Sequence, residues 1–169
     1  MRLVWAATLV WLLLIAISDL RQRRIPNVLS LGAAGLALLV LAAQGASALG
    51  GSVSSALAAA GIAAALTLPA YIGNLLGAGD VKLAVAMGLL SDAVTFGVGF
   101  VAGASLAGVW AVLWLLAQKE SSLAPRPCGS EPAPAGMTPV TRRRPVPFGA
   151  ALCAGFAASM LLRAVSQGM

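Results

Sequence analysis

The chain has 169 residues, of which 60% are hydrophobic and only 9% are charged. This composition excludes a soluble globular protein, because too few polar side chains exist to cover a surface in water, and it is typical of a membrane protein with several helices. The net charge of +6 does not indicate nucleic-acid binding, since the basic residues lie in short connections between apolar runs and not in a separate basic domain.

Histidine is absent, and the two cysteines, Cys128 and Cys153, are far apart in the sequence. Zinc and haem sites need closely spaced His or Cys ligands, so we expect no metal and no other cofactor. Catalysis by histidine is excluded because the sequence contains none. Both cysteines are interpreted as filler residues without a chemical role.

The apolar runs predict six helices, at residues 3–17, 28–43, 56–72, 81–90, 93–117 and 148–162. The connections are polar at 18–27, rich in Gly and Ser at 44–55, glycine-rich at 73–80, and polar and proline-rich at 118–146. We therefore expect one all-α domain over residues 1–169, a polytopic bundle of about six transmembrane helices. The fourth run is short for a full crossing.

The distribution of basic residues predicts the orientation of this bundle. If the connection after the first helix lies in the cytoplasm, the cytoplasmic side holds nine of the eleven basic residues, namely Arg21, Arg23, Arg24, Lys82, Lys119, Arg126, Arg142, Arg143 and Arg144. Only Arg2 and Arg163 then lie outside. Cytoplasmic loops of membrane proteins carry an excess of Lys and Arg, so both termini are predicted outside and the 118–146 loop inside.

Two aspartates lie at the borders of apolar runs, Asp19 after the first run and Asp80 in the sequence Gly77-Ala78-Gly79-Asp80. A carboxylate at the edge of the hydrocarbon is costly, so such a residue is a candidate functional group. Two crossings separate the positions, which predicts both carboxylates at the cytoplasmic face. Asp92 falls on the opposite side and is interpreted as a solvated turn residue or as the N-cap of the fifth helix.

A pair of neighbouring carboxylates tends to hold one shared proton, because both cannot comfortably ionise together. One carboxylate can then act as general base on a water molecule while the protonated one polarises a peptide carbonyl and later protonates the leaving amine. Gly77 and Gly79 are expected to let the chain turn without a Cβ and to bring Asp80 close to Asp19. Taken singly, each aspartate could instead be structural.

Three segments together resemble the type IV prepilin peptidases, aspartic membrane proteases of the G-x-G-D type. They are Asp19-Leu20-Arg21-Gln22-Arg23-Arg24-Ile25-Pro26-Asn27, Gly77-Ala78-Gly79-Asp80-Val81-Lys82-Leu83 and Pro147-Phe148-Gly149. The resemblance covers nearly the whole chain. It implies an enzyme of the bacterial inner membrane that removes the leader peptide of type IV-like prepilins or pseudopilins at the cytoplasmic face, just before the pilin's own N-terminal hydrophobic helix. It also implies Asp19 and Asp80 as the catalytic pair.

Longer members of the family carry a cytoplasmic domain with paired C-x-x-C motifs after the first helix and also methylate the new N-terminus. Here that connection is short and contains no cysteine. The chain therefore resembles the short branch that serves Tad/Flp-type pili, and the resemblance gives N-methyl transfer no support.

The remaining residues of these segments each have a structural alternative. Pro26 and Asn27 fit the start of the second helix, where a proline or a capping side chain meets unpaired amides. Lys82 either favours the charged form of Asp80 or extends to the membrane interface. Pro147, Phe148 and Gly149 begin the last helix or line a substrate groove. Arg142, Arg143 and Arg144 anchor the cytoplasmic side, with anionic lipid as a possible contact.

Two other functions remain open at this stage. The same carboxylates could carry protons or bind a cation in a small transporter. Alternatively, the chain could be a scaffold of a pilus or secretion assembly without chemistry of its own. The sequence does not fix the oligomeric state or the prepilin that is cleaved.

Overall fold

The computed structural model describes residues 2–22, 27–122 and 148–166, and all six predicted helices are present in this part of the chain. They are α1 (Arg2–Gln22), α2 (Asn27–Gln44), α3 (Val53–Ile72), α4 (Ala78–Leu90), α5 (Ala93–Ser122) and α6 (Phe148–Ser166). The described residues form no β-strand, only an isolated bridge between Ala46 and Ser52. The predicted all-α fold is confirmed.

Four of these helices are long and apolar enough to cross a membrane, with spans at Leu3–Arg21, Val53–Ile72, Ala93–Ala117 and Phe148–Ser166. α2 contributes a shorter apolar stretch, Val28–Gln44, and α4 has only 13 residues. Six helices were expected to cross, and the described residues supply four of full length. The fourth predicted helix is short, as its sequence indicated.

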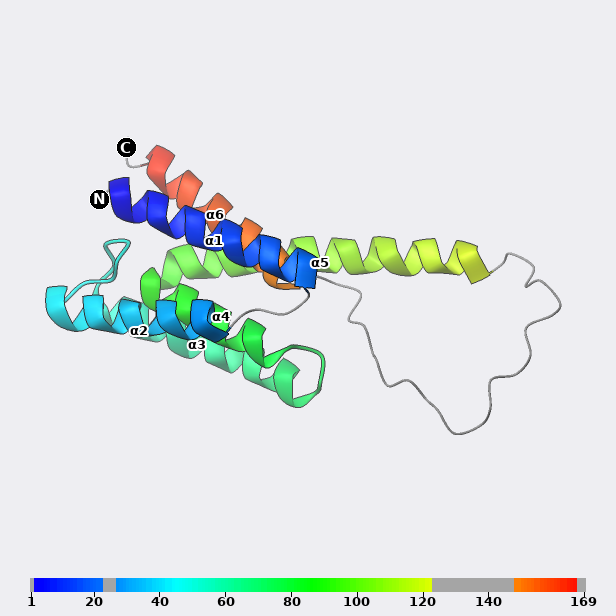
Figure 1. The fold of residues 1–169 in the computed structure, drawn as a ribbon, viewed down its shortest axis with the longest axis horizontal. Helices are drawn as coiled ribbons and strands as arrows, with labels where there is room; N and C mark the ends of the chain where they lie inside the picture. The colour runs from blue at the N-terminus through cyan, green and yellow to red at the C-terminus, as the bar shows by residue number, and fades with distance from the viewer. Residues whose placement is uncertain (1, 23–26, 123–147, 167–169) are drawn as a thin grey trace.

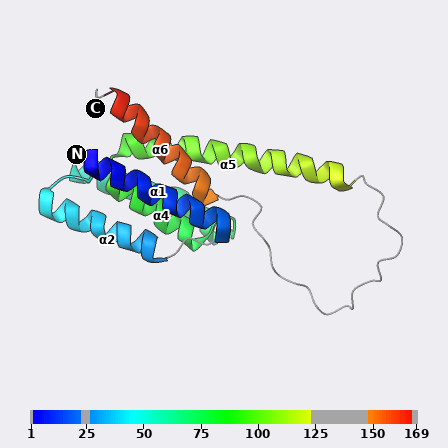
Figure 2. The same cartoon turned by 45° about the horizontal axis from the view of Figure 1, so that its top comes forward.

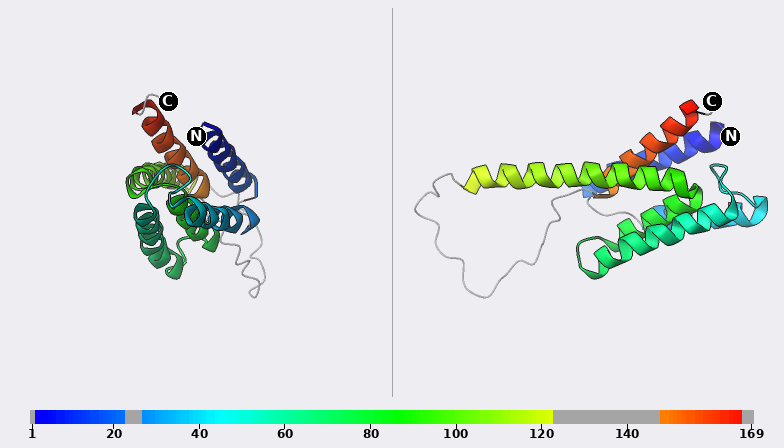
Figure 3. Two further views of the ribbon diagram at one scale, coloured as in Figure 1. Left: turned by 90° about the vertical axis from the view of Figure 1, so that its left-hand side faces the viewer. Right: turned by 180° about the vertical axis from the view of Figure 1, so that it is seen from behind.

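Successive helices run in opposite directions, so the two ends of the bundle are formed by different segments of the chain (Figure 1). The end of α1, the turn between α3 and α4, and the start of α6 lie toward one end, and we call it the aspartate end because Asp19 and Asp80 belong to these segments. Both termini and the turn between α4 and α5 lie at the opposite end. α5 continues past the other helices at the aspartate end, as the view from behind shows (Figure 3).

Close packing of small residues joins the helices. α5 and α6 meet at Gly99, Gly103 and Gly155, where a Cβ on Gly155 would overlap the backbone of the two other glycines. Gly88 of α4 lies against the backbone of α3 in the same way. Helices in lipid associate through packing and not through hydrophobicity, and small residues at these contacts let the helix backbones approach closely.

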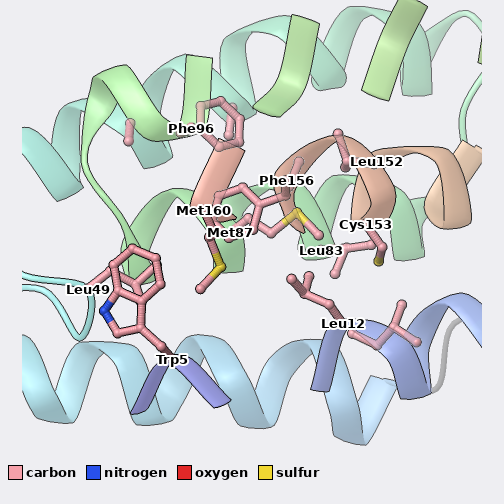
Figure 4. Close-up of a cluster of buried hydrophobic side chains, with 14 residues drawn as sticks. Trp5, Leu12, Leu49, Leu83, Met87, Phe96, Leu152, Cys153, Phe156 and Met160 are labelled. Carbon is pink, nitrogen blue, oxygen red and sulfur yellow. The ribbon is translucent and has the colours of Figure 1, made fainter. Parts of the chain in front are cut away.

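One buried cluster connects α1, α4, α5 and α6 (Figure 4). Its largest fully buried members include Ile15, Leu83, Phe96 and Phe156. Cys153 belongs to the same cluster and is 2% exposed, whereas Cys128 lies outside the described residues. α1 packs against α6, and α4 packs against α3, α2 and α6, so α6 contacts both helices that carry the two aspartates.

Candidate active site

Asp19 lies in the last turn of α1, whereas the sequence predicted a polar loop at this position. α1 continues through Gln22, five residues beyond the apolar run, because Ser18 to Gln22 include no helix-breaking residue and the end of hydrophobicity does not require the end of a helix. Arg21 follows as a basic residue in this last turn. Asp19 is only 7% exposed, which makes it the one buried carboxylate among the described residues.

The Asp19 carboxylate accepts a hydrogen bond from a distant part of the chain. Its Oδ2 lies 2.8 Å from the backbone nitrogen of Ala150, in the first turn of α6. The carboxyl end of α1 is unfavourable for a negative charge, whereas the amino end of α6 presents unpaired N–H groups and a positive dipole. α6 therefore supplies the environment that a buried carboxylate at the end of α1 needs.

Asp80 lies in the first turn of α4, because this helix begins at Ala78 and not after Asp80 as predicted. Its Oδ2 accepts a hydrogen bond from the backbone nitrogen of Gly77 at 3.1 Å. This is the arrangement in which the third residue of a helix caps its start with a carboxylate. Asp80 is half-buried, so that its surroundings are less enclosed than those of Asp19.

We expected Gly77 to be needed for the turn before α4, but its backbone conformation does not require glycine. Gly77 has φ −83° and ψ 149°, an extended conformation that any residue adopts, and Gly79 is helical. The left-handed residue of this turn is Asn74, with φ 57°. The amides of Leu75 and Leu76 then bond to the carbonyl of Ala70, which holds the turn against the end of α3 and sets the start of α4.

α6 connects the surroundings of the two aspartates. Its Ala150 donates to Asp19, and Cys153 follows Ala150 by three positions on the same helix. The Cys153 thiol packs in the buried cluster with Leu83 of α4, beside which it lies in Figure 4, and Leu83 follows Asp80 by three positions. Two carboxylates that are 61 positions apart in the sequence therefore belong to helices that both pack on α6, with their segments at the same end of the bundle.

Of the other residues in the three motif segments, the structure describes only some. Phe148 and Gly149 begin α6 as predicted, and α2 begins at Asn27. Lys82 lies half-buried in α4, and whether it acts on Asp80 or extends to the interface stays a prediction. Pro26, Pro147, the arginines at 142–144 and the part of the polar loop at 123–146 lie outside the described residues; residues 118–122 of that loop belong to α5 instead.

Asp92 caps the fifth helix, as predicted. Its carboxylate accepts hydrogen bonds from the hydroxyl of Thr95 at 2.7 Å and from the backbone nitrogen of Thr95 at 3.4 Å. It also forms an ion pair with Arg163 near the end of α6, a contact that the sequence did not predict. This pair lies at the end of the bundle opposite to Asp19 and Asp80.

Two carboxylates at one end of the bundle, one buried and one half-buried, are of the kind that can transfer protons to and from a bound peptide. Among the residues that the structure describes, no three His, Cys, Asp or Glu side chains gather as a metal-binding group.

Comparison with known proteins identifies the chain at the level of the family. The sequence model of the type IV leader peptidase family matches residues 6–113, which is more than half of the chain and includes both Asp19 and Asp80. No curated protein and no solved structure matches the chain. The chain is a member of the type IV leader peptidase family.

Proposed function

We propose that the protein is an aspartic endopeptidase that removes the leader peptides of type IV-like prepilins or pseudopilins, with Asp19 and Asp80 as the catalytic pair. The observation that carries this proposal is the meeting of three distant segments at the aspartate end. Asp19 accepts a hydrogen bond from Ala150 of α6, and α6 shares one buried cluster with Leu83, which follows Asp80 by three positions. Helix capping alone explains one hydrogen bond for each aspartate. It does not explain why both aspartates belong to segments at the same end of the bundle, and membership in a peptidase family supplies chemistry that can use such a pair.

In the proposed reaction, the two carboxylates share one proton. The ionised aspartate takes a proton from a water molecule, and the oxygen of this water attacks the carbonyl carbon of the scissile peptide bond. The protonated aspartate donates a hydrogen bond to the carbonyl oxygen and stabilises the negative charge that develops there. Collapse of the tetrahedral intermediate breaks the C–N bond, and a carboxyl group delivers a proton to the leaving amine.

The proposed orientation places the aspartate end in the cytoplasm and both termini outside. The alternating direction of the helices supports this orientation. Three basic residues lie toward the aspartate end: Arg21 near the C-terminus of α1, Lys82 in the first half of α4 and Lys119 near the C-terminus of α5. Arg163, one of the two basic residues assigned to the outside, lies at the opposite end. We further propose that the enzyme lies in a bacterial inner membrane and serves a Tad/Flp-type pilus without N-methyl transfer.

Co-expression with a prepilin encoded in the same genome tests this function. Wild-type protein is expected to convert the precursor band to the mature band, and Asp19→Asn or Asp80→Asn is expected to reduce the rate by roughly 100-fold or more, the usual contribution of a general acid or base. Asp92→Asn is the matched control, because this aspartate caps a helix at the opposite end and is expected to retain cleavage. Normal processing by either of the first two variants, at equal protein level in the membrane, contradicts the proposal.

A further inference from the structure

A groove of about 480 Å³ lies between α1 and α2, at some distance from the two aspartates. Its α1 wall includes Ala7 and Trp11, and its α2 wall includes Gly32, Ala33 and Leu36. The two helices pack mainly on different partners, α1 on α6 and α2 on α4. Figure 2 shows α4 behind the space that separates them. Consecutive antiparallel helices are thus held apart, and the space between them is open toward the surrounding lipid.

The lining of the groove defines the chemistry of what it accepts. Of the lining residues, only Thr8 and Gln44 have side chains that can form strong hydrogen bonds besides the indole of Trp11, and none is charged. The Thr8 hydroxyl donates to the carbonyl of Val4, and the Trp11 indole N–H donates to the carbonyl of Leu29 at 3.1 Å. These donors are satisfied within the protein. An occupant therefore needs an apolar surface and no polar group of its own.

Small residues on the walls favour a helix over a thin hydrocarbon chain. A Cβ built on Gly32 would meet nothing within 4 Å, and the short side chains of Ala7 and Ala33 leave room for an occupant on both walls. Small residues let the backbones of two helices in lipid approach closely, and this packing drives their association. The groove is thus shaped for the ridge of an apolar helix, of which the opposite side stays in lipid.

The direction of the groove connects it to the aspartates. Along α1 it extends from Trp11 to Leu3, away from the aspartate end. Trp11 precedes Asp19 by eight positions on one continuous helix, which corresponds to about 12 Å at 1.5 Å per residue. A peptide bond held at Asp19 and followed by an apolar helix would bring that helix alongside Trp11 after about two turns.

We infer that this groove holds the apolar helix of the substrate while its preceding peptide bond is cut. The inference rests on the proposed function, which supplies a substrate with a leader followed by an apolar helix. Leu29 is level with Trp11, because its carbonyl accepts the hydrogen bond of the Trp11 indole. Leu36 lies seven positions farther along α2, about 10 Å farther from the aspartate end. The part of the substrate that contacts Leu36 is therefore about fifteen residues after the cut.

Photo-crosslinking from two positions of α2 tests the contact directly. A photoreactive amino acid replaces Leu36, which lines the groove, or Leu39, which does not; both side chains are exposed, 62% and 68%. The Asp80→Asn variant is used so that the precursor stays bound. The expected result is an adduct with the prepilin from position 36 and none from position 39. Adducts with lipid only, with a second copy of the chain, or equally from both positions overturn the inference.

A pair of glycine substitutions tests the consequence for catalysis. Gly32→Leu fills the groove, whereas Gly35→Leu adds the same side chain to an exposed position of α2 that does not line it and where a Cβ also meets nothing. Gly32→Leu is expected to raise KM for the prepilin about tenfold, equivalent to roughly 1.4 kcal/mol. Gly35→Leu is expected to behave as wild type. Equal KM values for both variants overturn the inference.

The two proposals fail in different ways. If the proposed function is wrong, Asp19→Asn and Asp80→Asn retain leader removal, whatever the glycine variants do. If only the groove is misassigned, the aspartate variants lose cleavage while Gly32→Leu and Gly35→Leu remain alike.

Discussion

At the scale of single residues, the charge of Asp19 depends on a donor from the other end of the sequence. The carboxylate lies in the last turn of α1, where the dipole of its own helix opposes a negative charge. The N–H of Ala150 offsets this with a hydrogen bond of 2.8 Å. Hydrogen bonds to charged groups contribute about 1.5–3 kcal/mol, so this donor has a measurable effect on the site.

Replacement of Ala150 by proline removes this N–H. Proline is tolerated in the first turn of a helix, because the amides there have no partner within the helix. We expect Ala150→Pro to lower kcat/KM for leader removal roughly 10- to 100-fold, the equivalent of the lost hydrogen bond. Ala150→Gly is the control, since it keeps the N–H and loses only a methyl group. Steady-state cleavage in detergent or vesicles measures both, and equal rates for the two variants contradict the assigned role.

Replacement of Asp92 is expected to cost more stability than replacement of Arg163, although the two residues form one ion pair. Asp92 caps α5 through Thr95 as well as pairing with Arg163, whereas the Arg163 side chain donates to Asp92 and Thr95. Loss of an N-cap costs about 0.5–2 kcal/mol in addition to the pair. We expect Asp92→Ala to lower the midpoint of thermal unfolding more than Arg163→Gln does. The double variant is expected to resemble Asp92→Ala, and strictly additive shifts would show that the two residues are not coupled.

Some of these residue contacts could be predicted from the sequence and others could not. The N-cap was one of two predicted roles for Asp92, the other being a solvated turn residue, and both follow from its place between two apolar runs, a local signal. The donor at Ala150 leaves no trace in the sequence, because every residue except proline has a backbone N–H. The pair of Asp92 with Arg163 spans 71 positions, and the packing of Cys153 with Leu83 of α4 follows only from the placement of α6.

At the scale of helices, α6 is the element that joins the two halves of the site. The family match ends at residue 113, before α6 begins at Phe148. Nevertheless α6 contributes the donor to Asp19 and packs Cys153 in the same buried cluster as Leu83 of α4. Its position is fixed against α5, where Gly155 meets the backbone of Gly103 and Gly99. The glycines of α5 and α6 therefore act on Asp19 through the placement of α6.

A methyl group at Gly155 tests this coupling. No space exists for a Cβ there, so Gly155→Ala must push α6 away from α5, and overpacking of this kind costs about 1–3 kcal/mol. We expect a lower unfolding midpoint and reduced leader removal, because Ala150 moves with its helix. Gly108→Ala on α5 is the control, since a Cβ there meets nothing within 4 Å. A Gly155→Ala variant with unchanged activity would mean that α6 is not held by this contact.

The helices themselves were predictable, but their ends were not. Apolar runs identified all six elements because hydrophobicity marks the part of a helix that lies in lipid. A helix ends where its hydrogen bonding ends, so α1 extends to Gln22 and α5 to Ser122 beyond their apolar runs. Asp80 was placed in a loop because of its neighbouring glycines, although an acidic residue in the first turn also favours a helix start.

At the scale of the whole molecule, the aspartate end is recessed relative to α5. The backbone of Ala151 and Leu152, just after the donor to Asp19, lies against Gly103. The apolar part of α5 continues from there to Ala117, about 21 Å farther at 1.5 Å per residue. After Ala107, no side chain of α5 up to Ala117 is fully buried. A bilayer that covers this stretch also extends past the level of Asp19.

Water must nevertheless reach Asp19, since hydrolysis consumes water. Arg21, only two positions farther along α1, is exposed. We therefore expect a wet recess at the end of α1, with the protruding part of α5 in lipid beside it. Single cysteines compare the two surroundings, in a chain that carries Cys128→Ser and retains the buried Cys153. Leu20→Cys probes the recess and Leu113→Cys probes α5; the two side chains are similarly exposed, at 60% and 58%.

A membrane-impermeant maleimide is expected to label Leu20→Cys in inside-out vesicles and not in intact cells, because the recess opens to the cytoplasm in the proposed orientation. Leu113→Cys is expected to stay unlabelled from both sides, since a thiol in hydrocarbon neither ionises nor meets the reagent. Ser54→Cys, exposed near the start of α3 at the opposite end, is expected to react in intact cells. Labelling of Leu20→Cys from outside would invert the orientation, and equal rates at Leu20→Cys and Leu113→Cys would exclude a separate wet recess beside α5.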